Sequence, residues 1–478
     1  MDWLPEGHLA YFVLDLVREL DVAGIEDAIQ SKDGRGVRPY SPGMMTSLLL
    51  YAYCVGVFSS RKVERATYED VAFRVLSGGE HPHFTTVNAF RLAYRDALAG
   101  LFVQVLRLCA RAGLSTVGHV SLDGSKVQAN ASKHKAMSYG RMKEQEKRLA
   151  AEIEGLLFRA DQTDQREDEQ YGPGQRADEL PAEFQRRDAR LRRIREAKAA
   201  LEKEAAESRA AQLRRAAAAH RGQADVAPDA GERKRAATRA AKSDRQADEL
   251  SPRRDDDDDD DPGSGAVALP GHRVPTTPSG DPTDNAQRNF TDPDSRIMVR
   301  NGVFMQAYNA QVVASESQVI VAHAVTNQSP DQEHLVPMMK RVHDACGRFP
   351  AILTADTGYW SEGNLSSCER SGVDAYIAVR RKGEDGATLG RLPMSHAHEA
   401  RLRMHQKVTS PHGQSIYARR KVIVEPVFGQ IKQALGFTRF SLRGLPKVAA
   451  EWAFVCLCHN LLKLRRTLGP LPLTAVTA

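Results

Sequence analysis

The chain has 478 residues, with 67 Lys and Arg against 61 Asp and Glu and a formal net charge of +6 at pH 7. This length exceeds one ordinary domain, so we expect a main domain with at least one appended module. The basic balance permits a polyanionic partner without requiring one. The six cysteines follow neither a disulfide framework nor a paired metal-binding spacing, which excludes both classes and favours a reduced cytoplasm.

Residues 1–115 are expected to be helical. Their first stretch lacks the basic start of a signal peptide, and LLLYAYCVGVF at 48–58 is too short to cross a bilayer, so we expect no membrane partner. Within 63–96, two short helices flank a Gly-Gly-Glu-His-Pro turn, and the second carries Arg91 and Arg95. This pattern fits a helix-turn-helix whose arginines contact DNA, and it fits a plain helical bundle with solvated arginines equally well.

A strand is predicted next in TVGHVSLDGSKVQANAS, at 116–132, which alternates apolar residues and contains Asp123-Gly124. The composition then changes, and 140–250, rich in Ala, Arg, Glu and Lys, predicts two long helices divided by Gly-Pro-Gly at 172–174. The second of these is a candidate coiled-coil arm for self-association. Seven adjacent aspartates and the Pro-, Thr- and Asp-rich stretch to about 290 predict a disordered linker in preference to a metal site.

Regular structure is expected again from about 296. VFMQAYNAQVVAS and QVIVAHAVT predict a hairpin, followed by a helix at about 330–346, a buried strand that ends at Asp356, a capped helix and a further strand. The next helix carries VEPVFGQIKQALGFTRF, with Glu425 and Lys432. This order of elements is that of a ribonuclease H-like domain, in which the first and fourth strands are neighbours.

Three carboxylates would meet at one edge of that sheet. Asp123 and Asp356 would lie on the two neighbouring strands, and a helix packed on the sheet can bring Glu425 to the same edge. Such a cluster repels itself unless cations neutralise it, and oxygen-only ligands suit Mg²⁺ or Mn²⁺. Two such ions, about 3.5 to 4 Å apart, can activate the attacking oxygen and stabilise the leaving oxygen in a phosphoryl displacement.

Three stretches also carry a resemblance. SLDGSKVQANAS, ADTGYWSEGNL and YARRKVIVEPVFGQIKQALGF resemble the signature blocks of bacterial insertion-sequence DDE transposases, in the branch with a Tyr-Arg-Glu-Lys signature. The N-terminal stretch resembles the InsH-like module that precedes the catalytic domain in that branch. The similarity covers 1–135 and 296–465.

The resemblance implies roles for individual residues. Asp123, Asp356 and Glu425 match the catalytic, metal-binding triad. The accessory residues, which in the family contact DNA phosphates, match Tyr417, Arg420 and Lys432. The tyrosine and arginine stand one position further from the glutamate than in the commonest spacing, which puts Lys421 in the arginine's expected place and leaves the phosphate contact open between Arg420 and Lys421. Other candidate phosphate contacts are Lys126, Lys133, Arg380, Arg381 and Lys382.

We therefore predict an α/β protein that combines a ribonuclease H-like catalytic domain, a mixed sheet flanked by helices, with an all-α N-terminal domain and a helical and disordered insertion. The predicted parts are a helical DNA-binding and assembly domain at 1–115, the catalytic domain at 116–139 and 296–466, the insertion at 140–295 and a tail at 467–478.

The resemblance implies a DNA transposase that uses Mg²⁺ or Mn²⁺, with two ions expected, to cleave at insertion-sequence ends and transfer the freed strand into target DNA. Its partners would be double-stranded DNA, at terminal inverted repeats and target sites, and further copies of itself, in a homodimer or higher assembly. Its expected location is the cytoplasm, with nucleoid association when bound to DNA. Two alternatives stay open: a ribonuclease H-like nuclease without strand transfer, and a non-catalytic DNA-binding regulator derived from a transposase.

Overall fold

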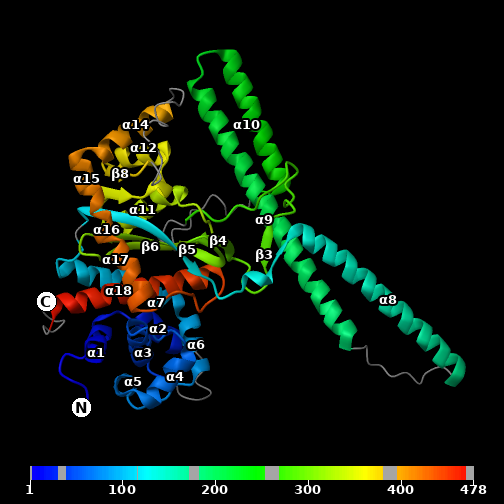
Figure 1. Ribbon diagram of the computed structural model, residues 1–478, viewed down its shortest axis with the longest axis horizontal. Coiled ribbons are helices and arrows are strands. Elements are labelled where there is room, and N and C mark those ends of the chain that lie inside the picture. Colours follow the sequence, from blue (N-terminus) through cyan, green and yellow to red (C-terminus); the bar gives the residue numbers. More distant parts are fainter. Residues whose placement is uncertain are drawn as a thin grey trace. The chain divides into compact units, whose positions relative to one another are not determined.

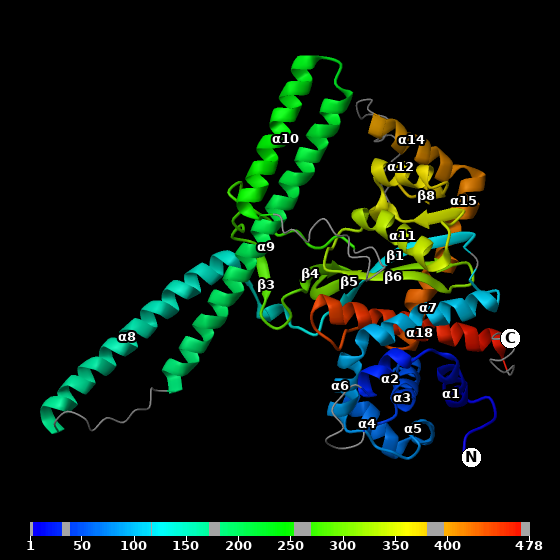
Figure 2. The ribbon, with the colours of Figure 1, turned by 180° about the vertical axis from the view of Figure 1, so that it is seen from behind.

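The computed structural model divides the chain into two compact units (Figures 1 and 2). The first unit comprises 1–130, 264–271 and 297–478, and the second comprises 131–263 and 272–296. The residues that the structure describes are 3–30, 39–115, 117–171, 182–252, 269–379 and 396–469. The acidic run at 255–261 and the basic residues at 380–382 lie outside these ranges. Within them, no helix has both the length and the hydrophobicity needed to cross a membrane.

Helices make up the N-terminal part of the first unit, as the sequence predicts. They are α1 (Leu9–Glu19), α2 (Ala23–Gln30), α3 (Pro42–Cys54), α4 (Ser60–Glu69), α5 (Val71–Leu76), α6 (Phe84–Ala93) and α7 (Arg95–Arg111). Pro42 begins α3, where the missing proline N–H costs no hydrogen bond, and every residue of this helix from Met45 to Cys54 is buried. A helix that is apolar on all sides belongs inside a larger core, and these helices share their compact unit with the sheet.

A six-stranded sheet forms the centre of the first unit. Its strands are β1 (His119–Gln128), β4 (Arg296–Arg300), β5 (Val303–Ser315), β6 (Ile320–Thr326), β7 (Ile352–Ala355) and β8 (Asp374–Ile377). They lie in the order β4-β5-β1-β7-β8, with β6 also paired to β5. β1 runs antiparallel to β5 and parallel to β7. The first strand is thus the neighbour of the strand that precedes Asp356, as predicted, and the mixed sheet is compatible with a ribonuclease H-like domain.

Helices cover both faces of this sheet. α11 (Leu335–Cys346) and α12 (Glu362–Arg370) lie on one side, and α7 and α18 (Leu445–Leu468) lie on the other, with α1 to α6 beyond them (Figures 1 and 2). The side chain of Asn460 on α18 pairs with the backbone N–H and C=O of Ile320, both at 2.8 Å, and the indole N–H of Trp452 donates to the carbonyl of Gln311 at 3.2 Å. These bonds fix the long buried helix against β6 and β5.

The second unit consists of long helices and a two-stranded ribbon. Its elements are β2 (Ala136–Ser138), α8 (Tyr139–Tyr171), α9 (Ala182–Val226), α10 (Ala230–Leu250) and β3 (Gln287–Asn289). α9 packs against α8 through Met142, Leu149, Leu191 and Ile194. It is tied to α10 by ion pairs that include Arg214 with Asp248 at 2.9 Å. The predicted coiled-coil arm therefore packs against helices of its own chain.

Two predictions for this unit are wrong. The sequence predicts two long helices between 140 and 250, whereas the structure has a third, α10, because Pro228 follows the end of α9 and Asp229 caps a new helix by accepting from the N–H of Glu232. Disorder was expected to about 290, yet β3 pairs with β2. Arg288 on β3 is also held by Glu204 of α9 at 2.8 Å, a contact distant in sequence that composition does not reveal.

Candidate active site

Asp123 and Asp356 lie side by side at the centre of the sheet. In the register of the two parallel strands, Leu122 is opposite Ala355, so the following residue on each chain segment is one of the two aspartates. Asp356 also caps a 3₁₀ turn, η4 (Thr357–Tyr359), by accepting from the N–H of Gly358 at 2.9 Å. The strand pairing alone therefore puts two carboxylates next to each other.

Glu425 lies on a helical segment that is divided into several short helices. This segment consists of α14 (His396–Thr409), α15 (Pro411–Ala418), α16 (Arg420–Ile423), α17 (Glu425–Gly429) and the π-helical turn η5 (Gln430–Ala434). Glu425 is the first residue of α17 and Pro426 follows it, so the glutamate stands at a helix start, as predicted, where the helix dipole favours a carboxylate. Val427, Phe428 and Ile431 are buried and hold the segment on the core.

One guanidinium shows that the three carboxylates face a common point. Arg420 on α16 approaches Asp123 at 2.9 Å, Glu425 at 3.6 Å and Asp356 at 4.0 Å. Its side chain is 14% exposed and that of Asp123 is 17% exposed, whereas Glu425 is 53% exposed. The cluster is therefore closed on the side of β1 and open to solvent on the side of the glutamate.

Burial sets the protonation of this cluster. Desolvation raises the pKa of Asp123 from 3.8 to about 6, an effect that the Arg420 charge opposes and the neighbouring Asp356 reinforces. The carboxylates in turn raise the pKa of Arg420, against the desolvation that acts on it. The Arg420 charge thus stabilises the ionised form of the buried Asp123 carboxylate.

The donors of this cluster fit a hard divalent cation. All three are carboxylates, the ligands that suit Mg²⁺ or Mn²⁺. As the side chains stand, the described residues contain no group of three His, Cys, Asp or Glu arranged to hold a metal ion. Arg420 provides the positive charge between the carboxylates, and its Nε is buried without a hydrogen-bond partner among the described residues. One N–H group of the Arg420 guanidinium therefore lacks a hydrogen bond among the described residues.

The predicted accessory residues differ in burial and in whether they face the triad. Tyr417 on α15 is half-buried, and its pKa is raised by desolvation, with Arg420 opposing. Lys421 is exposed on α16, so Arg420 is the basic residue that faces the triad. Lys432 on η5 contacts the hydroxyl of Ser125 on β1, and desolvation lowers its pKa to about 8. Tyr417, Arg420 and Lys432 thus gather around the carboxylates, and Lys421 points to solvent.

Arg91 and Arg95 lie away from the triad. Arg91 is on α6 and Arg95 is the first residue of α7. Arg91 is largely buried and donates to the hydroxyl of Tyr53 at 3.0 Å, the carbonyl of Phe58 at 3.2 Å and the hydroxyl of Ser441 at 3.2 Å. Arg95 pairs with Asp96 at 3.2 Å. Arg91 therefore fastens α6 to α3 and to the segment before α18, and DNA contact by either arginine stays a prediction.

A fourth carboxylate lies close to the triad and was not predicted. Asp331 accepts from Asn309 Nδ2 at 2.6 Å and from Gln311 Nε2 at 2.8 Å, and it pairs with Lys126 Nζ at 3.2 Å. Its negative charge contributes to the raised pKa of Asp123. Gln311 also accepts from the buried hydroxyl of Tyr359, the last residue of the turn that Asp356 caps. Lys126, a candidate phosphate contact, is thus paired within the protein.

A signal for this network was present in the sequence. Asn309 and Gln311 are two polar residues, two positions apart, in a largely apolar and buried strand, so they share one face of that strand. Buried polar groups need partners. Their spacing indicates a polar network on that face, although it does not reveal Asp331 as the acceptor.

Two family models match parts of this chain. Residues 379–465 match the family described as Transposase DDE domain, and residues 1–92 match the one described as Transposase domain (DUF772). The first match includes Arg420, Glu425 and Lys432, and both matches support an insertion-sequence transposase. The comparisons with curated proteins and with solved structures gave no match.

Proposed function

We propose that this protein is a DNA transposase that cleaves DNA at the ends of its element and joins the freed 3′-hydroxyl to target DNA. The observation that carries this proposal is the approach of Asp123, Asp356 and Glu425 to the single guanidinium of Arg420. These carboxylates come from three distant segments of the chain. A binding protein has no need of such a mutually repulsive group, whereas metal-dependent phosphodiester chemistry requires one.

The triad would hold Mg²⁺ or Mn²⁺, which when bound supplies charge neutralisation and activation of the attacking oxygen. Asp123 and Asp356 are fixed by strand pairing, and Glu425 is carried on the more exposed side of the cluster. With cations held by the triad, Arg420 would be available for another anion, and its fork of N–H donors suits a DNA phosphate. Lys432, with a pKa near 8, stays largely protonated at neutral pH and provides a second phosphate contact.

The partners follow from the same proposal. The DNA would carry terminal inverted repeats, and two ends would be brought together by a dimer or a larger assembly of this chain. Because Asp356 and Glu425 contact neither target sequence nor repeat sequence in this scheme, their removal should stop chemistry and leave DNA binding intact.

The test is cleavage and joining of a duplex that carries the inverted repeats flanking the reading frame. Wild type is compared with Asp356→Ala and Glu425→Ala, with Mg²⁺ and with EDTA, and DNA binding is measured in parallel. Glu369→Ala, at an exposed position on α12, is the matched control because it removes an acidic side chain outside the cluster. We expect metal-dependent cutting and joining by wild type and by the control alone.

Each other outcome has a definite meaning. Cutting without joining would replace the proposal with a nuclease that lacks strand transfer. Binding without metal-dependent cutting by wild type would replace it with a DNA-binding regulator. Equal activity in the two triad variants would remove Asp356 and Glu425 from the catalytic site.

A further inference from the structure

A second polar surface lies in the first unit, at the end of β1 that is remote from the triad. It is a cavity of about 870 Å³ that opens between the starts of α4 and α6 and the segment before α18. Its lining contains three arginines and six neutral polar side chains, and no acidic residue. The residues that carry the argument are Arg61, Asn88, Arg91, Asn130, Arg439 and Ser441.

The cations of this cavity are available to a ligand. Arg61 and Arg439 are exposed, and the guanidinium of Arg61 lies over the ring of Phe84 at 4.8 Å. Arg91 lies behind them, where its bonds to Phe58 and Ser441 hold the two walls together. The surface therefore combines Arg91, whose hydrogen bonds join two segments of the chain, with two exposed arginines, Arg61 and Arg439.

A row of basic residues connects this cavity to the triad. Arg420 contacts Asp123 and Lys432 contacts Ser125, both on β1. Further along the same strand, Arg439 forms a bridge with Gln128. Arg439 also donates to the side chain of Asn130 at 3.2 Å, and Arg443 donates to its backbone carbonyl at 2.8 Å. Basic residues thus lie beside β1 at Asp123, at Ser125 and, through the backbone β-bridge of Arg439, at Gln128 next to the cavity.

The extent of β1 sets the separation between the cavity and the triad. Asp123 and Gln128 are five residues apart on an extended strand, which is about 17 Å at about 3.3 Å per residue. Phosphates on one strand of a duplex are spaced about 3.4 Å apart along the helix axis. A phosphate in the cavity would therefore lie about five base pairs from a phosphodiester held at the triad.

We propose that this cavity binds the sugar-phosphate backbone of the DNA end about five base pairs from the cleaved bond, through Arg61 and Arg439. The inference rests on the proposed function for the identity of the ligand. It gives Arg91 a positioning role in place of direct DNA contact, because its guanidinium forms the floor of the site.

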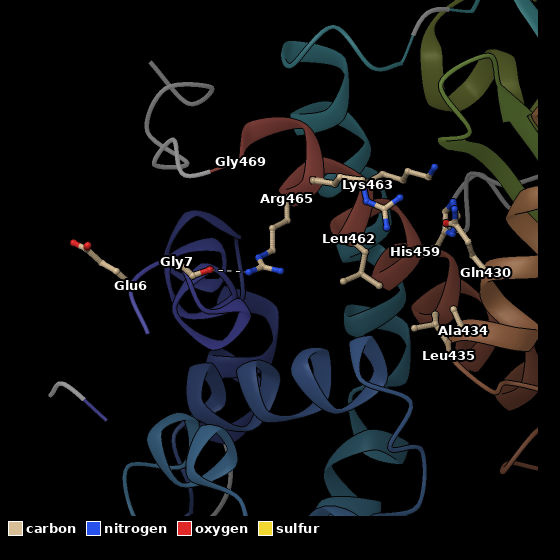
Figure 3. Close-up of a pocket in the computed structure, with 11 residues that line it drawn as sticks. Glu6, Gly7, Gln430, Ala434, Leu435, His459, Leu462, Lys463, Arg465 and Gly469 are labelled. Atoms are coloured by element: carbon tan, nitrogen blue, oxygen red, sulfur yellow. Dashed lines mark hydrogen bonds between the residues drawn. The ribbon is translucent and has the colours of Figure 1, made fainter. Parts of the chain in front are cut away.

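A second basic cavity in the same unit does not share these features. It has a volume of about 520 Å³ and is lined by residues of α18, η5 and the N-terminal segment (Figure 3). There Arg465 donates to the carbonyl of Gly7 at 2.7 Å, and Lys463 donates to the side chain of Gln318. Glu6 also lines it. Two of its cations are engaged within the protein and Glu6 adds a negative charge, so it has less to offer a phosphate.

The test measures binding of the full chain to the end duplex in EDTA, where no cleavage occurs. Arg61→Ala and Arg439→Ala should each weaken binding about tenfold and lower the slope of log affinity against log salt by about 1. Arg107→Ala is the control, because Arg107 is exposed on α7 outside the cavity, and it should change affinity less than twofold. Thermal unfolding should be unchanged in all three variants, since each removes an exposed side chain.

A second measurement identifies the phosphate. One phosphate at a time is replaced by an uncharged methylphosphonate. The replacement about five base pairs from the cleaved bond should weaken binding by wild type. The same replacement should not weaken binding by Arg439→Ala any further. If both cavity variants bound the duplex with the affinity and the salt slope of wild type, the inference would be overturned. This result is distinct from failure of the proposed function, which is read from cleavage by wild type with Mg²⁺ and not from binding in EDTA.

Discussion

Replacing Arg420 by Ala removes the positive charge that faces all three carboxylates. The closest contact is with Asp123 at 2.9 Å, between side chains that are 14% and 17% exposed. Breaking a buried ion pair by removal of one partner costs about 3 to 5 kcal/mol, because the other charge stays buried and uncompensated. Since Asp356 and Glu425 are more exposed, we expect the lower end of this range, about 3 kcal/mol of unfolding free energy at pH 7.

The loss should depend on pH in a defined direction. In wild type the pKa of Asp123 is raised from 3.8 to about 6, so the folded chain takes up this proton before the unfolded chain does as the pH falls. Arg420 opposes this rise, and its removal moves the pKa of Asp123 higher still. Asp123 in the variant is therefore largely neutral at pH 5. The deficit relative to wild type should shrink between pH 7 and pH 5.

The assay is urea denaturation in EDTA, followed by the tryptophan fluorescence of the chain, to which Trp452, buried in the core of the first unit, contributes. The matched control is Arg419→Ala, whose guanidinium pairs with Glu316 at 2.7 Å but is 52% exposed, so that its loss should cost less than about 1 kcal/mol. Added Mg²⁺ should stabilise Arg420→Ala more than wild type. Equal stability of the two variants at pH 7, or a deficit unchanged at pH 5, would refute the reasoning.

Three further substitutions test contacts in the first unit, two by the same urea denaturation and one by thermal unfolding. In Gly124→Ala the new Cβ would lie 2.2 Å from Gln311 Nε2, so we expect a loss of about 1 to 3 kcal/mol. Gly118→Ala, which meets nothing within 4 Å, should have little effect, and equal effects would exclude the clash. Asp331→Asn leaves Lys126 without its ion pair and should lose about 1 to 3 kcal/mol. A fully stable variant would show that this pair is dispensable. Glu451→Gln removes the carboxylate that accepts from the backbone N–H groups of Ser441 and Leu442, both at 3.0 Å, and should lower the melting temperature. An unchanged melting temperature would contradict this role.

The sequence predicted the sheet and the neighbouring positions of two aspartates. Alternating apolar residues identify strands, and their order resembles that of a ribonuclease H-like domain, in which the first and fourth strands are neighbours, so Asp123 and Asp356 were expected on neighbouring strands. The register of β1 and β7 confirms that expectation. The start of α17 at Glu425 was also readable, because Pro426 fits only the first turn of a helix.

Other features depend on geometry that no local pattern contains. Asp331 meets Gln311 and Lys126 only because β1 and β5 pair with Gly124 opposite Gln311. The choice between Arg420 and Lys421 depends on the rotation of a four-residue helix, α16, which motif spacing leaves open. Arg91 is a residue type expected at a DNA surface, yet its guanidinium donates to the hydroxyls of Tyr53 and Ser441 within the protein. Contacts distant in sequence decide all three cases.

The second unit interrupts the chain between β1 and its partners, and this has a consequence for the order of synthesis. Gln128 pairs with Ala307 and Val120 pairs with Ser315, so a growing chain leaves β1 unpaired until the intervening segment has been translated. At about 5 to 20 residues per second this delay is about 10 to 40 s. Glu425 emerges later still. A chain released early from the ribosome thus carries the two aspartates without Glu425, the third carboxylate that faces Arg420.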